Sequence, residues 1–262
     1  MKLTSNWFYT PGTMQITYDK TKMIERGNTQ FGVNEFIVHY LAGQPQLKTL
    51  MDIPCGEGSL LRTLKNVLPS LQTSGVDLYS TPYPEIVDRF QKMSIDDWIE
   101  TESRKFDVVS SVSGVMVHDQ LTAFFRKCVS CLNDNGTLIV SNDNFLTMRD
   151  RFHFLFFGHV KRFKKVYTQD EGNWNMVPIQ ALWKLLKQNN FEIETIKYKA
   201  VYIEDWLLLP FALVLFPIHL LYILSLRSEM SFKQKYQLFP IWVFLARHYV
   251  IVAKKTSSRL PN

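Results

Sequence analysis

The chain has 262 residues, of which 46% are hydrophobic and 21% are charged, a balance typical of an ordered protein with a sizeable core and unlike that of a disordered one. The formal net charge of +6 favours anionic surroundings, which can be phosphate, nucleic acid or the negative face of a membrane. Three cysteines cannot all pair, and the first ten residues lack the apolar stretch of a signal peptide. We therefore expect a reducing, cytoplasmic setting.

Short apolar strands alternate with helical patterns along most of the chain. In chain order, the pattern predicts a strand over 48–54, a helix over 59–68, a strand over 73–79, a helix over 84–92, a strand over 106–112, a helix over 120–132, a turn over 133–136, a strand over 137–141, a helix over 178–189, a strand from 191 and a last strand over 248–253. This order predicts an α/β fold with an open, largely parallel sheet, helices on both faces and a ligand crevice at the carboxyl ends of the strands.

The pair Cys128 and Cys131 has the C-x-x-C spacing of a metal site. No second ligand pair lies at zinc-site spacing, and the surrounding sequence FFRKCVSCL has a helical pattern. We predict two cysteines packed on one helical face and no metal site.

An apolar block interrupts the alternation before the last strand. Residues 206–226 contain no Asp, Glu, Lys or Arg and have the length of a membrane span, but the apolar run on the way back, 238–246, is too short to cross a bilayer. Pro210 and Pro217 are expected to break or kink a single helix. We predict a re-entrant or interfacial apolar hairpin, with a buried helical pair or a homodimer interface as alternatives. Headgroup-type residues edge and flank it: Trp206, Tyr222, Arg227, Lys233, Lys235, Trp242 and Arg247.

The stretch MDIPCGEG, residues 51–58, joins a strand to a helix. It fits three interpretations: a nucleotide-binding turn, a cysteine nucleophile at Cys55, or a plain loop. Gly56 and Gly58 let a ligand approach backbone N–H groups at a helix start, and Asp77 ends the next strand, where a carboxylate can accept hydrogen bonds from ribose hydroxyls. NAD is disfavoured because the third glycine of its motif is Leu61 here.

The motifs LMDIPCGEG, FDVVSSVSGVMVHDQ and FFRKCVSCLNDNGTLIVSNDN together resemble class I S-adenosylmethionine-dependent methyltransferases over most of residues 48–200. The segments NDNFLTMRDRFHFLFFGHVKRF and NWNMVPIQALWKLLKQNNFEIETI are similar to a branch found among bacterial surface-polysaccharide and glycolipid enzymes. The resemblance implies a Rossmann-like doubly wound, mostly parallel seven-stranded sheet with an antiparallel last strand and an apolar helical insertion before it. It also implies S-adenosyl-L-methionine as the cofactor.

The resemblance over residues 48–200, together with the apolar block that follows it, predicts the domain organisation. Residues 1–47 are expected to form a substrate-side or lid segment, and residues 48–200 the cofactor-binding domain with a substrate-side insertion at 145–177. Residues 201–247 form the apolar, membrane-associated insertion, and residues 248–262 the last strand and tail.

The resemblance also implies which residues hold the cofactor. Asp52, Pro54, Gly56 and Gly58 are expected at its methionine portion, and Asp77 and Leu78 at the ribose. A second group of expected contacts comprises Asp96 and Ser113. For Asp96 or Asp97, SIDDWIE equally has the pattern of a capped helix start. The chain departs from the family at Pro54, where a glycine is usual, at Val117–His118, where an acidic residue and a histidine are usual, and at Trp174 or Asn175, where the branch commonly has a histidine.

A hydroxyl acceptor requires a base, and three histidines are candidates: His118 just after the fourth strand, then His153 and His159. The last two lie in a basic and aromatic stretch, 149–166, that suits a lipid-phosphate headgroup, a membrane surface or single-stranded nucleic acid, or forms a solvated helix face. We favour the lipid or membrane because an apolar block follows.

We therefore expect O-methylation of a sugar or lipid-linked acceptor by an enzyme attached peripherally or monotopically to the inner face of a membrane. The alternatives are methylation of a small molecule or of an isoprenoid or quinone-type lipid, and a non-catalytic membrane-attached cofactor-binding module. Nucleic acid is not expected as a partner, because SSVSGVM stands where base amino-methylating enzymes have an Asn- or Asp-Pro-Pro-aromatic motif and Cys55 is wrongly placed for a cytosine-methylating nucleophile.

Overall fold

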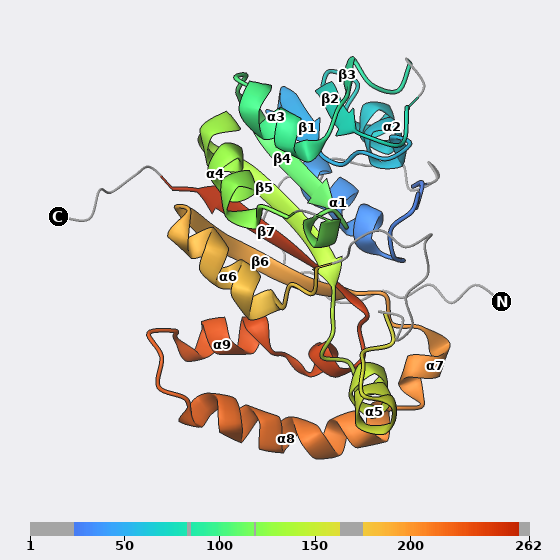
Figure 1. Ribbon diagram of the computed structural model, residues 1–262, viewed down its shortest axis with the longest axis vertical. Coiled ribbons are helices and arrows are strands. Elements are labelled where there is room, and N and C mark those ends of the chain that lie inside the picture. Colours follow the sequence, from blue (N-terminus) through green and yellow to red (C-terminus); the bar gives the residue numbers. More distant parts are fainter. Residues whose placement is uncertain (1–23, 83–84, 118, 163–174, 257–262) are drawn as a thin grey trace.

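A single mixed sheet organises the protein. The computed structural model describes residues 24–82, 85–117, 119–162 and 175–256. The seven strands lie in the order β3-β2-β1-β4-β5-β7-β6, and β7 runs antiparallel to both of its neighbours (Figure 1). The predicted sheet is therefore confirmed. Its strands are β1 (Thr49–Asp52), β2 (Gln72–Asp77), β3 (Arg89–Lys92), β4 (Phe106–Val112), β5 (Leu132–Asp143), β6 (Phe191–Lys199) and β7 (His248–Lys255).

Helices cover both faces of the sheet. On one face, α1 (Val33–Ala42) and α2 (Ser59–Val67) bury apolar side chains such as Ile37 and Leu64 against the strands. On the other face, the core contains Trp98 from α3 (Ile95–Thr101), Phe124 from α4 (Leu121–Cys131) and Leu186 from α6 (Ile179–Gln188). Strands β1, β4 and β7 are buried on both sides, which explains their continuous apolar sequences.

Local sequence accounts for several element boundaries. Ser94 caps α3 by accepting a hydrogen bond from the Asp97 backbone N–H, and the Asp97 side chain accepts from the Ser94 N–H.

Cys128 and Cys131 are buried free thiols of α4, as predicted.

The helix predicted over 84–92 is wrong: the described residues 85–88 form a turn and a bend, without helix. Residues Arg89–Lys92 form β3, which pairs in parallel with β2 at the edge of the sheet. Four residues of mixed polarity have little strand signal of their own, so the neighbouring strand decides their conformation. The turn predicted over 133–136 lies within β5, where Asn135 has a φ of 59°.

The insertion between β6 and β7 is helical. It contains α7 (Ile203–Trp206), α8 (Leu209–Ser225), α9 (Phe232–Leu238) and the short 3₁₀ helix η2 (Ile241–Phe244). In Figure 1, α8 runs below the sheet and α9 returns between α8 and α6, which gives a hairpin. Of the expectation that Pro210 and Pro217 break or kink a single helix, the break is wrong, because Pro210 lies in the first turn of α8 and Pro217 lies inside the continuous helix. None of the helices in the described part of the chain has the length and apolarity to span a membrane.

Helix α5 (Met148–Phe157) follows β5 in the sequence and packs against this insertion. Met148 joins a small core with Ala212 and Phe244, and the Phe152 and Phe211 rings meet edge to face with centroids 5.2 Å apart. Asn144 fixes the turn before α5 because its amide donates to the carbonyls of Val243 and Ala246 at 2.8 and 2.7 Å. The apolar insertion is thereby attached to the end of the sheet at which a ligand crevice is expected.

Candidate active site

A cavity of about 620 Å³ lies at the carboxyl ends of β1, β2 and β4. This is the edge at which strand order reverses between β1 and β4, and such a switch point is where open α/β sheets bind ligands. The volume lies within the usual range for small-molecule sites. The cavity is lined by every predicted cofactor residue except Gly58: Asp52, Pro54, Gly56, Asp77, Leu78, Asp96 and Ser113.

Asp77 organises the loops around this cavity. Its Oδ2 accepts from the Gly56 N–H at 2.8 Å, and its Oδ1 accepts from the N–H groups of Tyr79 and Ser80 at 2.9 and 2.7 Å. A carboxylate has about four lone-pair positions, so these three bonds leave acceptor capacity for a ligand hydroxyl. A Cβ at Gly56 would meet nothing within 4 Å, which leaves the backbone there open to a ligand.

Asp52 is almost completely buried at the floor of the cavity. Its Oδ1 accepts from the Ser110 hydroxyl at 2.7 Å. Burial raises the pKa of Asp52 to about 7, the Ser110 hydrogen bond opposes that rise, and the negative charge of Asp77 adds to it. The carboxyl group therefore changes charge near neutral pH and is well suited to bind a cation.

The remaining residues of the loop have structural positions. Gly58 lies outside the cavity lining; it precedes α2 with a φ of 79°, and a Cβ there would lie 2.9 Å from Pro82. Cys55 is buried, and burial raises the pKa of its thiol far above the ordinary value, which argues against a nucleophile. The segment SIDDWIE was expected to supply either a cofactor contact or a helix cap. Asp96 lines the cavity, whereas Asp97 belongs to the cap of α3.

The three histidines predicted as candidate bases differ in their position relative to the cavity. His118 lies outside the described residues, although its neighbours Val117 and Asp119 line the cavity. The structure does not bring His153 or His159 to the cavity. Their rings pack against each other with centroids 4.5 Å apart at the end of α5, and His153 Nδ1 lies 2.9 Å from the His159 carbonyl. Both were expected over the substrate, but the turn after α5 holds them together instead.

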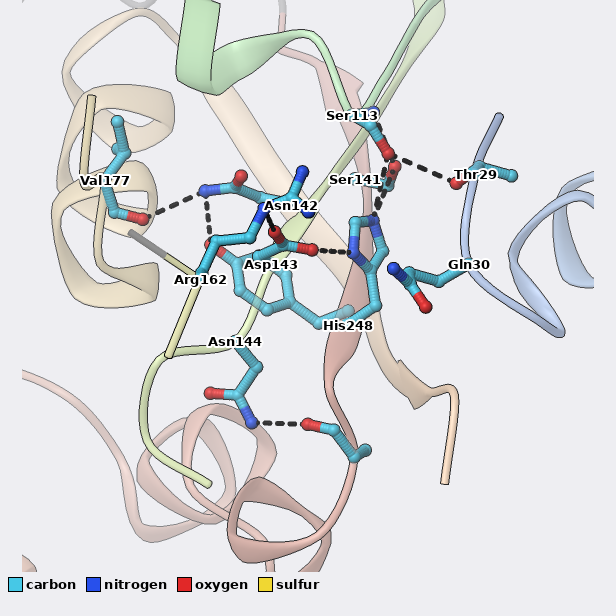
Figure 2. A network of polar contacts seen from close by, with 12 residues as sticks. Thr29, Gln30, Ser113, Ser141, Asn142, Asp143, Asn144, Arg162, Val177 and His248 are labelled. Carbon is cyan, nitrogen blue, oxygen red and sulfur yellow. Dashed lines mark hydrogen bonds and ion pairs between the residues drawn. The ribbon is translucent and has the colours of Figure 1, made fainter. Parts of the chain in front are cut away.

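A buried histidine that we did not predict lies beside the cavity instead. His248, the first residue of β7, pairs with Asp143, the last residue of β5, and its Nδ1 lies 2.9 Å from Asp143 Oδ1 (Figure 2). Its Nε2 lies 3.1 Å from Ser141 Oγ and 3.5 Å from Ser113 Oγ. The detectable signal was a histidine at the start of an otherwise apolar strand, opposite the polar end SNDN of β5.

A second, basic recess of about 280 Å³ adjoins the cavity. The two share Gln30, Asp143 and Arg162 in their linings. Four cations border the recess, and two of them are already paired: Arg162 with Asp143 at 2.7 Å, and Arg247 with Asp205 at 2.9 Å. The other two, Arg149 and Lys161, form no ion pair with another described residue.

The N-terminal segment contributes to both regions. Arg26, Thr29 and Gln30 line the cavity, whereas α1 packs into the core and residues 1–23 lie outside the described part. Within the predicted substrate-side insertion, α5 is described and residues 163–174 are not.

The sheet order, the glycine turn after β1 and the acidic residue that ends β2 define the class: a Rossmann-like, S-adenosylmethionine-dependent methyltransferase. Residues 30–196 match the family described as "Methyltransferase domain", and the chain belongs to this family. No curated protein sequence matches the chain.

Solved methyltransferases share the fold. A SAM-dependent methyltransferase from Archaeoglobus fulgidus is 16% identical, with a TM-score of 0.51 over 86% of this chain and 95% of the other. A putative S-adenosylmethionine-dependent methyltransferase from Listeria monocytogenes is 14% identical, with a TM-score of 0.52 over 86% of this chain and 98% of the other. The cyclopropane synthase MmaA2 from Mycobacterium tuberculosis is 16% identical, with a TM-score of 0.52 over 84% of each chain.

Proposed function

We propose that the chain transfers a methyl group from S-adenosylmethionine to a hydroxyl of a sugar or lipid-linked acceptor at the surface of a membrane. The observation that carries the acceptor class is an exposed apolar surface on α5 and α8, next to the basic recess that adjoins the cofactor cavity. The membrane is expected to be the inner face of the cytoplasmic membrane, because of the reducing setting and positive charge deduced above.

The cavity fits this cofactor residue by residue. Asp52 lines the cavity and would bind the ammonium group of the methionine portion, and the open backbone at Gly56 would let that portion approach. Asp77 retains acceptor capacity for a ribose hydroxyl, and Leu78 and Asp96, which also line the cavity, would contact the ribose and the adenine. When bound, S-adenosylmethionine supplies a methyl group already activated by a sulfonium. The protein must then position the acceptor, exclude water and remove a proton.

Cofactor affinity is expected to depend on pH through Asp52. Because its pKa is raised to about 7, the group is neutral below that pH and negative above it, and only the negative form attracts an ammonium. We expect S-adenosylmethionine to bind about tenfold more weakly at pH 6 than at pH 8, measured by calorimetry. In Asp52→Asn this pH dependence should disappear.

Methylthioadenosine is the matched probe, because it keeps the adenosine and lacks the ammonium group. Its affinity for the unmodified protein should change little between pH 6 and pH 8. An equal loss of affinity for both compounds at low pH would contradict the assignment of Asp52 to the ammonium.

The apolar surface covers the outer side of the helical insertion. Along α8, side chains facing inward recur at Ala212, Phe216, His219 and Ile223, which is helical spacing. The opposite side of α8 is equally apolar but exposed, and the end of α5 extends it. Its members are Phe154, Leu155, Phe156, Phe157, Phe211, Val214, Ile218, Leu221 and Tyr222. An exposed apolar patch of this extent is typical of a surface that binds lipid or protein.

The basic recess favours lipid over a second protein copy as the partner. The recess shares residues with the cofactor cavity, and Arg149 on its border belongs to α5, the helix whose end carries part of the apolar surface. An amphiphile inserted through its tail would present its headgroup there. Arg149 and Lys161 border the recess, and Arg227 and Lys233 are exposed at the far end of α8. Cations next to an apolar helix face match an anionic membrane surface.

The test is the transfer of labelled methyl from S-adenosylmethionine to fractionated membrane extract of the host. We expect the label in a lipid or lipid-linked sugar fraction, as a methyl ether. Label only in water-soluble small molecules would favour the small-molecule alternative, and label in an amine would exclude a hydroxyl acceptor. Cofactor binding without label in any fraction would favour the non-catalytic module.

A further inference from the structure

A buried chain of hydroxyl, imidazole and carboxylate borders the cofactor cavity. We infer that Ser113, His248 and Asp143 form a proton relay that removes the proton of the acceptor hydroxyl during methyl transfer. This rests on the proposed function only in requiring a hydroxyl acceptor. Ser113 is the member that contacts the acceptor, and His248 and Asp143 act through it.

The carboxylate end of the relay has one contact on each oxygen. Asp143 Oδ1 lies 2.9 Å from His248 Nδ1, and Oδ2 is ion-paired with the Arg162 guanidinium at 2.7 Å (Figure 2). A negative Asp143 accepts a hydrogen bond from Nδ1–H, which leaves Nε2 without a proton and able to accept one. The same carboxylate then stabilises the imidazolium that forms, which is the role of the acidic residue in triads of this kind.

The hydroxyl end of the relay reaches the cavity. His248 is fully buried, so it cannot contact an acceptor directly. Ser113 lines the cavity, and its Oγ lies 3.5 Å from His248 Nε2 and 3.2 Å from the Thr29 hydroxyl. In the absence of substrate Ser141 Oγ is nearer to Nε2, at 3.1 Å, and hydrogen bonds of a catalytic site often tighten only when substrate binds.

The backbone of Ser113 supports a functional role. Its φ is 56°, a left-handed conformation that non-glycine residues rarely adopt and that is enriched at functional sites. The conformation is held by its N–H, which donates to Ser141 Oγ at 3.0 Å. It places Ser113 directly after β4, at the switch point of the sheet where the ligand is expected.

Atoms and charges balance in the proposed step. The acceptor oxygen bonds to the methyl carbon as the carbon–sulfur bond breaks, and the bonding pair remains on sulfur. The acceptor proton passes to Ser113 Oγ while the proton of Ser113 passes to His248 Nε2. After the product leaves, the proton returns through Ser113 to water in the crevice.

The first test does not require an acceptor. Nitrogen-15 NMR of the imidazoles, with His248 assigned by comparison with His248→Gln, reports which ring nitrogen carries the proton. We expect a proton on Nδ1 and none on Nε2 at neutral pH. A neutral ring protonated on Nε2 would overturn the relay, whatever the outcome for the proposed function.

The second test measures labelled methyl transfer to the membrane extract at saturating cofactor. His248→Gln keeps an amide that can donate to Asp143 but cannot take up a proton, and Ser113→Ala removes the link to the cavity. Each is expected to lower kcat by about 100-fold, as for other general bases. His248→Gln should leave cofactor affinity within about twofold of the unmodified protein, because His248 does not line the cavity. The matched control is His219→Gln, the same change at a half-buried histidine of α8, which should leave kcat unchanged.

The pH profile separates proton transfer from a structural role. Because the relay needs an Nε2 that is free to accept a proton, activity of the unmodified protein should fall as the pH is lowered, and this fall should be absent from the residual activity of His248→Gln. Saturating cofactor removes the contribution of Asp52, and the other charged groups facing His248 are Asp143, Arg162 and, on β6, Lys199. If both variants keep the kcat of the unmodified protein and still lose activity at low pH, the relay is overturned. If His248→Gln fails to fold, the relay is tested by the kcat of Ser113→Ala and by the ring nitrogen of His248 that carries the proton.

Discussion

Asp77→Ala is expected to lower the affinity for S-adenosylmethionine by about tenfold or more in calorimetry. The proposed role of the carboxylate is to accept a hydrogen bond from a ribose hydroxyl, and a hydrogen bond to a charged group contributes about 1.5 to 3 kcal/mol. The same substitution removes the three backbone hydrogen bonds that hold Gly56, Tyr79 and Ser80 around the cavity. Loss of loop order adds to the loss of direct contacts.

Asp107→Ala is the matched control. Asp107 Oδ2 also accepts from two backbone N–H groups, those of Lys48 and Thr49, but at the amino edge of the sheet and outside the cavity. Its loss should lower thermal stability and leave cofactor affinity unchanged. Unchanged affinity in Asp77→Ala would exclude the ribose assignment, and equal losses in both variants would mean that the effect is one of folding.

The double substitution Val214→Glu and Leu221→Glu is expected to abolish binding to liposomes of anionic lipid in flotation. Both side chains are 69% exposed and lie on the outer side of α8. Burying an aliphatic side chain of this size contributes about 1.5 to 3 kcal/mol, so removing two weakens partition by roughly 100-fold or more, before the repulsion between glutamate and anionic lipid is counted. Cofactor affinity should not change, because neither residue lines the cavity.

A charge-matched control separates apolar contact from net charge. Gln72→Glu and Gln188→Glu add the same two negative charges at exposed positions of β2 and α6 and should leave most of the liposome binding intact. If the unmodified protein fails to float with liposomes and is a dimer that the α8 substitutions dissociate, the surface is an interface between copies of the chain. That result would exclude the membrane proposal and support the dimer alternative.

Local sequence predicted the elements whose pattern stands on its own. The apolar run of β4 and the leucine spacing of α2 define a buried strand and an amphipathic helix without knowledge of their neighbours. Tertiary contacts decide the elements for which local sequence gave a wrong or open answer. Residues 89–92 become a strand through pairing with β2, and α8 continues past Pro217 without a break while its inner side packs on Phe244 and its neighbours.

That the proposed cofactor residues line one cavity was predictable, because they lie in short motifs at the ends of consecutive strands. Asp52, Gly56 and Asp77 fall within 26 positions of sequence, and parallel pairing brings the strand ends to one edge. Of the predicted bases, His118 lies outside the described residues, and His153 and His159 lie away from the cavity because they pack against each other in a turn after α5. Their sequence position near a basic stretch contained no information about that turn.

The sequence by itself determined the sheet, its glycine turn, the cofactor class and the existence of an apolar insertion, because each depends on local periodicity or on a contiguous motif. Only the tertiary structure decided what lies opposite the cofactor turn. His248 and Asp143 are 105 positions apart and meet because β7 runs antiparallel to β5, so that the first residue of one strand faces the last residue of the other. Such a pair depends on strand register, a property of the assembled sheet that no local pattern specifies.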